Sequence, residues 1–293
     1  MKAGRPSSTS LLIAHGLLLA DATAGLRPLL VDESAALTRR LLDAAEPERW
    51  FDMALRHPFL RRAIFAGERL FLPGILLHWL ARKRLLDAVA HEALAAGCRQ
   101  IVVLGAGLDT LALRLQSAAV CFELDHPVTQ AIKRRAMADG PVLVAADLLH
   151  ASVAEVLRAQ LRFAANQPTL YIAEGLLMYL PPARVAELFC EIAGLSAPGS
   201  RFAFTFMEAR TGHRIAFHNE RRIIGWGLRW RGEPFRWALA RTDMAAFAAQ
   251  HGWELASLSS PEELRRRFLT PAGLGNAPLA IGESVATAYL RAR

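Results

Sequence analysis

The chain has 293 residues, of which 53% are hydrophobic and 21% charged, and its formal net charge is +8. Such a composition supports a large buried core and excludes extensive disorder. Nearly all of the positive charge is arginine, because Lys2, Lys83 and Lys133 are the only lysines. The arginines are spread along the chain, so a solvated surface explains the charge and we expect no nucleic-acid partner.

The N-terminal segment and the cysteines bear on the compartment. An apolar run at residues 11–20 follows Lys2 and Arg5 in roughly the layout of a signal peptide. However, His15 and Gly16 interrupt the run, which is far short of the ~20 residues that span a bilayer. Three widely spaced cysteines without a Cys-x-x-Cys pair indicate neither a disulfide framework nor a zinc site. We therefore expect a cytoplasmic protein with no metal and no membrane partner.

The first hundred residues predict helices. Stretches with helical spacing of apolar residues lie at 10–21, 33–44 and 76–96. Thr9 and Ser10 are candidate N-caps of the first stretch, and Gly97 provides the C-terminal stop of the third.

Beyond Gly97 the pattern changes to short apolar runs alternating with helical stretches. Strands are predicted at 101–104, 119–122, 142–145, 169–173 and 202–207, with helices after Asp109, Pro127, Ser152 and Pro182. Five strands with four intervening helices indicate a parallel sheet that is covered on both faces. A helix at 242–251, strands at 253–258 and 284–290, and a helix near 261–268 would complete the sheet. The expected fold is therefore α/β, Rossmann-like and doubly wound, with a mostly parallel seven-stranded sheet and an antiparallel edge strand.

The strongest local signal is the glycine turn after the first strand. The apolar strand 101–104 runs directly into Gly105 and Gly107, and Asp109, the acidic candidate for ligand binding at this strand end, precedes a predicted helix. Glycines let the backbone turn sharply and approach a ligand, while a helix start offers free amide groups. Thr110 stands where the dinucleotide fingerprint requires a third glycine. This pattern favours a nucleoside-type ligand without a pyrophosphate over an NAD-dependent oxidoreductase.

Acidic residues follow three further strands at the edge of the sheet where ligands bind. Glu123 and Asp125 come about twenty residues after the glycines, where a carboxylate can grip a ribose diol. Strand alternation places both on one face, and Asp125 is preferred because it lies nearer the strand end. Asp147 with Leu148 suits an adenine edge and face, and Glu174 points into the same crevice. Each acid alone could cap a helix or be solvated, but their coincidence at one edge favours a binding site.

Several strings of the sequence resemble those of the leucine carboxyl methyltransferase family and its bacterial relatives. They lie at 5–7, 82–84, 104–110, 123–127, 146–148, 174–180 and 232–235, and so cover most of the chain. The resemblance implies S-adenosylmethionine as methyl donor. The length suits one α/β domain and no linker interrupts the sequence, so we expect a single methyltransferase domain over residues 1–293. Within that domain we expect a helical cap region at 1–98, a cofactor-binding core at 99–207, a substrate-covering insert at 208–241 and the rest of the sheet at 242–293.

The same resemblance implies roles for individual residues at the donor. Arg82 would hold the carboxylate, since arginine matches a carboxylate bidentately, and Gly105 would lie under the methionine part. Asp125 would bind the ribose, and Glu174 would lie near the amino group. Asp147 and Leu148 would contact the adenine. One position departs from many relatives: Leu149 stands where they have arginine, so the resemblance implies the donor and leaves the acceptor open.

The acceptor side is predicted from reaction chemistry. A phenol, alcohol or protonated amine usually needs a general base, and His213 and His218 lie in the insert that we expect to cover the acceptor. Tyr179, five residues after Glu174, is a further candidate for acceptor contact. Both histidines could instead lie on the surface. Tryptophans and arginines at 226–237 could form a pocket for an anionic substrate or pack amphipathically.

Several reactions are compatible with this site. O-methylation of a small-molecule carboxylate or hydroxyl ranks first, above N- or C-methylation. A nucleic-acid methyltransferase is disfavoured because Glu174 and Gly175 follow the fourth strand, where base-amino methylation typically shows an Asn/Asp-Pro-Pro-aromatic string. A non-catalytic nucleoside-binding protein is disfavoured by the acids at the strand ends.

Overall fold

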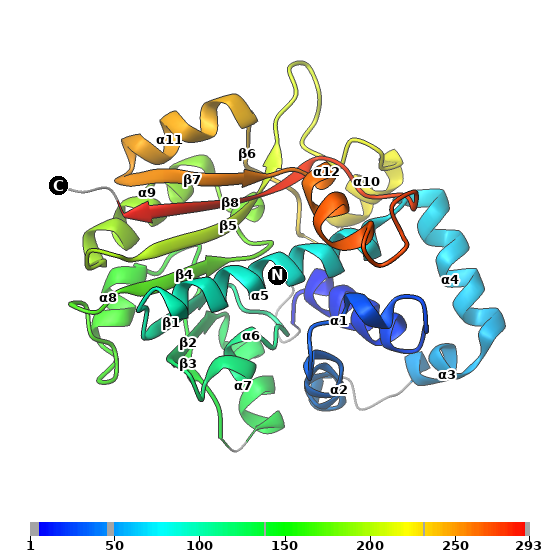
Figure 1. The fold of residues 1–293 in the computed structure, drawn as a ribbon, viewed down its shortest axis with the longest axis horizontal. Helices are drawn as coiled ribbons and strands as arrows, with labels where there is room; N and C mark the ends of the chain where they lie inside the picture. The colour runs from blue at the N-terminus through cyan, green and yellow to red at the C-terminus, as the bar shows by residue number, and fades with distance from the viewer. Residues whose placement is uncertain (1–5, 46–49, 138, 231, 291–293) are drawn as a thin grey trace.

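A computed structural model describes residues 6–45, 50–137, 139–230 and 232–290. Arg5, the first residue of the family-like strings, lies outside them. A central sheet is covered by helices on both faces, and a group of N-terminal helices lies beside its carboxyl-end edge (Figure 1). The strands are β1 Gln100–Leu104, β2 Val120–Asp125, β3 Val142–Ala145, β4 Thr169–Ala173, β5 Arg201–Glu208, β6 Ala238–Leu239, β7 Trp253–Ser259 and β8 Glu283–Leu290.

The helices fall into an N-terminal group and a group that connects the strands. The first group is α1 Ser8–Asp21, α2 Ser34–Ala45, α3 Trp50–Arg56, α4 Pro58–Phe71 and α5 Ile75–Ala95. The second is α6 Leu111–Leu115, α7 Pro127–Ala136, α8 Val153–Arg158, α9 Pro182–Leu195, α10 Arg222–Trp230, α11 Met244–Gln250 and α12 Pro261–Leu264. Short helical turns lie at Arg27–Leu29, Leu177–Tyr179 and Arg241–Asp243, and α12 continues into a π-type turn at Arg265–Leu269.

The strand order is β3-β2-β1-β4-β5-β8-β7, and the two-residue β6 pairs with β5 beside this path. Strands β1 to β5 are parallel. The strand order reverses between β1 and β4, and doubly wound sheets bind ligands at such a point. The antiparallel strand is β8, which pairs with β5 on one side and with β7 on the other. The predicted α/β fold is confirmed. The antiparallel strand was expected at the edge of the sheet, whereas β8 lies one position inside it and β7 forms the edge.

The two faces of the sheet pack against different helices because side chains alternate along each strand. In β1, Ile101 and Val103 join a core with α1 and α5, whereas Val102 and Leu104 join a core with α8, α9 and α11. The second core contains edge-to-face aromatic pairs, such as Phe189 with Phe202, whose ring centroids lie 4.9 Å apart. A sheet that is buried on both faces holds its strand ends rigidly, and these ends carry the candidate site.

The three predicted N-terminal helices begin within two residues of their predicted starts, and α1 begins at Ser8, two residues early. Ser7 is the N-cap of α1 and accepts hydrogen bonds from the backbone N–H groups of Thr9 and Ser10, so Thr9 and Ser10 are helical residues. Helices α3, α4 and α10 and strand β6 were not predicted. No single described helix is long and apolar enough to cross a membrane. The neighbouring helices α4 and α5 reach that length and composition only together, and they are bent by 89° at the break between them.

Candidate functional site

A cavity of about 480 Å³ lies at the carboxyl ends of β1 to β4, and we call it the central cavity. Its volume falls in the range of small-molecule sites, ~300–1,000 Å³. Eight of the nine residues that were predicted to bind the donor line it, together with one predicted acceptor residue. These lining residues are Arg82, Gly105, Gly107, Asp109, Asp125, Asp147, Leu148, Glu174 and Tyr179. The exception among the donor residues is Glu123.

The glycine turn after β1 forms one wall of the cavity. Gly105 has a φ of +64° and Gly107 a φ of +52°, in the left-handed region that residues with a side chain rarely adopt. A Cβ at Gly105 would lie 2.8 Å from Leu176 Cδ1, and a Cβ at Gly107 would lie 3.1 Å from Ser10 Cβ. The turn therefore requires glycine both for its backbone conformation and for its close contacts with the chain above it.

We expect Gly105→Ala to lower the free energy of unfolding by about 1–3 kcal/mol, because alanine would be strained at this positive φ. Urea unfolding of the two proteins measures the difference. Gly25→Ala is the matched control, since a Cβ there meets nothing within 4 Å and no positive φ is involved. Equal losses in both variants would contradict a special role for the turn.

Asp125 and Glu123, which the sequence could not separate, have different surroundings. Asp125 lines the central cavity, where its Oδ2 accepts a hydrogen bond from Gly107 N at 2.5 Å and its Oδ1 one from His126 N at 2.6 Å. Glu123 is buried, and its Oε2 lies 2.6 Å from Lys133 Nζ on α7. Burial raises the pKa of Asp125. Burial also raises the pKa of Glu123, although the charge of Lys133 acts to lower it. Glu123 is thus one member of a buried ion pair behind the cavity wall.

The Glu123–Lys133 pair predicts a clear effect on stability. Lys133→Met would leave the Glu123 carboxylate buried and unpaired, at a cost of about 3–5 kcal/mol. A raised pKa in the folded state means that the native protein binds more protons, so stability falls as pH rises and the variant should be less stable at pH 8 than at pH 5. Urea unfolding at both pH values measures this. The double variant Glu123→Leu/Lys133→Met should regain most of the loss, and a failure to do so would contradict the pairing argument.

Asp147 and Leu148 follow β3 and lie side by side at the cavity. Asp147 Oδ1 accepts a hydrogen bond from Leu149 N at 3.1 Å, which holds the loop after the strand. The Leu148 side chain is buried, and its carbonyl accepts a hydrogen bond from Arg184 Nε at 2.9 Å. An apolar side chain and a carboxylate are therefore fixed next to each other at this end of the cavity.

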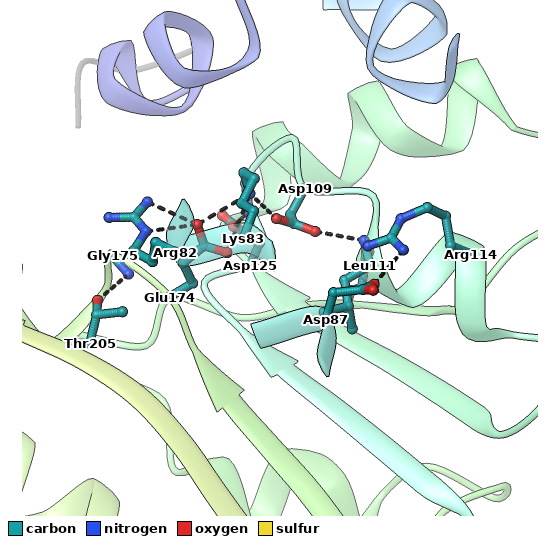
Figure 2. Close-up of polar contacts among 12 residues, drawn as sticks. Arg82, Lys83, Asp87, Asp109, Leu111, Arg114, Asp125, Glu174, Gly175 and Thr205 are labelled. Atoms are coloured by element: carbon teal, nitrogen blue, oxygen red, sulfur yellow. Dashed lines mark hydrogen bonds and ion pairs between the residues drawn. The ribbon is translucent and has the colours of Figure 1, made fainter. Parts of the chain in front are cut away.

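Charged side chains from α5 and from the ends of three strands meet at the other end. Figure 2 shows Glu174 next to Arg82 and Lys83, with Asp109 on the other side of Lys83. Arg82 Nη2 lies 2.8 Å from Glu174 Oε1, and Lys83 Nζ lies 3.2 Å from the same oxygen. Lys83 also donates a hydrogen bond to Asp109. Burial acts to raise the pKa of Asp109, but Lys83 outweighs it, so this pKa lies below its usual range.

Glu283 completes the group from the start of β8. Its two carboxylate oxygens accept hydrogen bonds from Arg82 Nη1 at 2.9 and 2.7 Å, and His78 Nε2 lies 2.7 Å from Oε2. Burial opposes the ionisation of Glu283, yet Arg82 and His78 together lower its pKa to about 2. Arg82 is thus a buried cation between two carboxylates, Glu174 and Glu283.

Helix α1 and the segment after α10 meet above the cavity. Glu233 accepts hydrogen bonds at the start of α1, from Ser8 N at 2.9 Å and from Thr9 Oγ1 at 2.7 Å. Tyr179 donates a long hydrogen bond of 3.4 Å to Thr9 Oγ1, and its ring packs against Phe235. Burial raises the pKa of Tyr179, so the phenol stays protonated at neutral pH. This side of the cavity is aromatic and is closed by polar contacts between distant segments.

Sequence reasoning missed several residues of the site and placed others differently. Lys83, Glu233 and Glu283 line the cavity without having been given a role, and only the strings at 82–84 and 232–235 hinted at the first two. His213 is exposed, and His218 is half-buried with its Nε2 3.4 Å from Glu208 O. Neither histidine is among the lining residues, because the loop after β5 directs them elsewhere.

Comparison with known proteins gives the context of this geometry. Residues 14–193 match the model of the leucine carboxyl methyltransferase family. The chain belongs to this family. A relative from Mycobacterium ulcerans, whose name places it among S-adenosyl-L-methionine-dependent methyltransferases, is 35% identical over 254 residues, covering 83% of this chain and 79% of the relative. The family and the enzyme class that the sequence predicts, a methyltransferase, are confirmed.

Two solved structures share the fold of this leucine carboxyl methyltransferase family member. A protein of Streptomyces avermitilis, described as a member of the DUF574 family, has a TM-score of 0.58 and 20% identity, covering 86% of this chain and 96% of that chain. A structure from Thermobifida fusca, named as a methyltransferase, has a TM-score of 0.56 and 17% identity, with coverage of 86% and 94%. At such identities the likeness supports the α/β architecture alone.

Proposed function

We propose that this protein transfers the methyl group of S-adenosylmethionine to an oxygen of a small apolar molecule, at a hydroxyl or a carboxylate. The observation that carries the proposal is the central cavity, which joins a wall of strand-end carboxylates to a wall of aromatic side chains. A concave cavity of about 480 Å³ suits a nucleoside-type donor and a small acceptor better than a protein or nucleic acid.

The residues present fit the donor. The Gly105–Gly107 turn leaves room for close approach, Asp125 is fixed at a position suited to a ribose diol, and Asp147 with Leu148 is suited to adenine. Glu174 suits the amino group and Arg82 the carboxylate, and the donor would replace the Arg82–Glu174 ion pair, while Arg82 keeps Glu283 as its partner. When bound, the donor supplies an electrophilic methyl group on a positively charged sulfur.

The segment 208–241 and the N-terminal helices would form the acceptor side of a single methyltransferase domain. Phe217, Ile224 and Phe235 from that segment line the cavity opposite the strand ends, and Tyr179 lies against Phe235. These side chains would hold an apolar acceptor in line with the methyl group and exclude water, which are the main tasks of the protein in such a displacement. Tyr179 would orient the acceptor by hydrogen bonding rather than as a base, because its pKa is raised. The positions of His213 and His218 give them no part in this proposal.

N-methylation of a small amine is the second candidate. Glu233 and Glu283 both line the cavity, and carboxylates favour a cationic acceptor. Both are already paired, Glu233 with the start of α1 and Glu283 with Arg82, so we rank O-methylation first.

A screen of small hydroxyl, carboxyl and amine compounds with labelled S-adenosylmethionine tests the proposal. Label should pass to an apolar hydroxyl or carboxyl compound, and Phe235→Ala should raise KM for that acceptor while leaving donor binding unchanged. Loss of the label in mild base distinguishes a methyl ester from an ether or a methylamine. Transfer to amines alone would favour the second candidate, and donor binding without transfer to any class would contradict the proposed function.

A further inference from the structure

Helices α4 and α10 carry large apolar side chains that face solvent. Phe59 on α4 is 77% exposed, and Trp226 and Trp230 on α10 are 64% and 71% exposed. Leu70, Phe71 and Ile223 on the same two helices are also exposed. Exposed aromatic residues in such a concentration are unusual for a surface that only contacts water.

Each helix gathers these side chains on one face. On α4 exposed apolar residues recur every three or four positions, at Phe59, Ala63, Ala66 and Leu70. On α10 they run from Ile223 through Trp226 to Trp230 in the same way. Side chains at this spacing lie above one another on a helix, so each helix has a continuous outer face.

The two outer faces belong to neighbouring elements. Arg221 N, just before α10, donates a hydrogen bond to Phe71 O at the end of α4 at 2.9 Å. Asn219 Nδ2 donates another to Pro73 O at 3.0 Å. In Figure 1, α4 runs along the margin of the molecule and its C-terminal end lies near α10. We call the exposed side chains of α4 and α10, with the adjacent Arg221, the α4–α10 surface.

The charged residues of this surface are basic. Arg62, Arg69, Arg222 and Arg229 are exposed on the two helices. The single acid within α4 and α10 is Glu68, which is half-buried and accepts a hydrogen bond from Leu76 N at 3.4 Å. Arginines interleaved with tryptophan and phenylalanine match the headgroup region of an anionic bilayer, where aromatic rings sit among lipid headgroups and arginines pair with phosphates.

We propose that the α4–α10 surface docks peripherally on an anionic phospholipid membrane. The surface adjoins the acceptor side of the central cavity, because Leu72 follows Phe71 and Ile224 follows Ile223, and both Leu72 and Ile224 line the cavity. Docking would bring that side of the cavity close to the bilayer, where apolar compounds dissolve. The sequence alone predicted no membrane partner, because its N-terminal apolar run is too short to span a bilayer, and a peripheral contact needs no spanning segment.

Co-sedimentation with vesicles tests this proposal. The full chain should bind vesicles of phosphatidylcholine mixed with phosphatidylglycerol. It should bind much less to vesicles of phosphatidylcholine alone, and binding to the mixed vesicles should weaken at high salt. Each arginine that contacts an anionic surface contributes about fivefold to binding, so Arg222→Gln/Arg229→Gln should weaken it at least tenfold. Trp226→Ser/Trp230→Ser should also weaken it at least tenfold.

The control is Arg158→Gln/Leu161→Ser, which removes an exposed arginine and an exposed leucine at the end of α8, on the opposite side of Figure 1 from α4. It should bind like the unaltered chain. Calorimetric titration with S-adenosylmethionine checks that every variant is folded. Equal binding to both vesicle types, or the same loss in the control, would overturn the proposal. So would a dimer in light scattering that Trp226→Ser/Trp230→Ser dissociates, or binding to duplex DNA without binding to vesicles.

Discussion

Asp125→Ala is expected to weaken the binding of S-adenosylmethionine about 100-fold or more. Asp125 is the one strand-end carboxylate whose two oxygens are both oriented by backbone N–H groups, from Gly107 and His126. Two hydrogen bonds from a ribose diol to a carboxylate contribute ~1.5–3 kcal/mol each, which together correspond to about 100-fold or more in Kd. Calorimetric titration measures the change. Glu155→Ala, an exposed acid on α8, is the control and should bind the donor normally.

The same carboxylate predicts how donor binding depends on pH. Burial raises the pKa of Asp125, so protonation sets in at a higher pH than the ~4 of an ordinary aspartate. Only the ionised carboxylate binds the diol. The affinity for S-adenosylmethionine should therefore begin to decline, as the pH is lowered, at a pH well above ~4. Asp125→Asn should bind weakly at every pH and lose this dependence. A variant that retains the full pH profile would assign the titration to another group.

The sheet and the strand-end acids that line the central cavity could be predicted because their signals are local. Each parallel strand is a short apolar run, and Asp125, Asp147 and Glu174 stand at the end of a strand or within two residues after it. The rule that strand ends of a parallel sheet meet at one edge then brings these acids together without any knowledge of side-chain contacts. Glu123 shows the limit of this reasoning. Strand alternation treats it like Asp125, and only its buried contact with Lys133, ten residues later on α7, sets it apart.

Residues brought in from distant segments gave no local signal. Glu283 lies 201 positions after Arg82 and reaches it only because β8 pairs antiparallel with β5, where Glu283 stands opposite Met207. Nothing in the neighbourhood of Glu283 in the sequence indicates a buried carboxylate. His213 and His218 were expected on the acceptor side, but they do not line the cavity. A histidine in a loop near the site carries no information about the direction of its side chain. Helix α4 escaped prediction because its outer face is apolar and arginine-rich, and none of its residues is buried.

Arg82→Met is expected to lower the free energy of unfolding by about 3–5 kcal/mol and to abolish detectable donor binding. The substitution would leave the Glu283 carboxylate buried next to His78 without its main counter-charge, which is the costly way to break a buried ion pair. Glu174 would keep Lys83 as a partner. Urea unfolding and calorimetric titration on the same preparations measure the two effects separately. Leu161→Ser, at a fully exposed position far from the cavity, should change neither.

Glu283→Gln separates the structural from the binding role of Arg82. In the folded state the pKa of Glu283 is lowered to about 2. Its ionised carboxylate therefore contributes stability above the ordinary glutamate pKa of ~4.3, and this contribution is lost as pH falls from ~4.3 to about 2. Glu283→Gln should therefore be destabilised at pH 7 and flatten the stability profile in that window, yet still bind the donor through Arg82. Arg82→Met/Glu283→Gln should regain part of the stability without regaining binding, because no buried charge is left unpaired. If the double variant recovered donor binding, Arg82 would have only a structural role, and the carboxylate of the donor would be held by another residue.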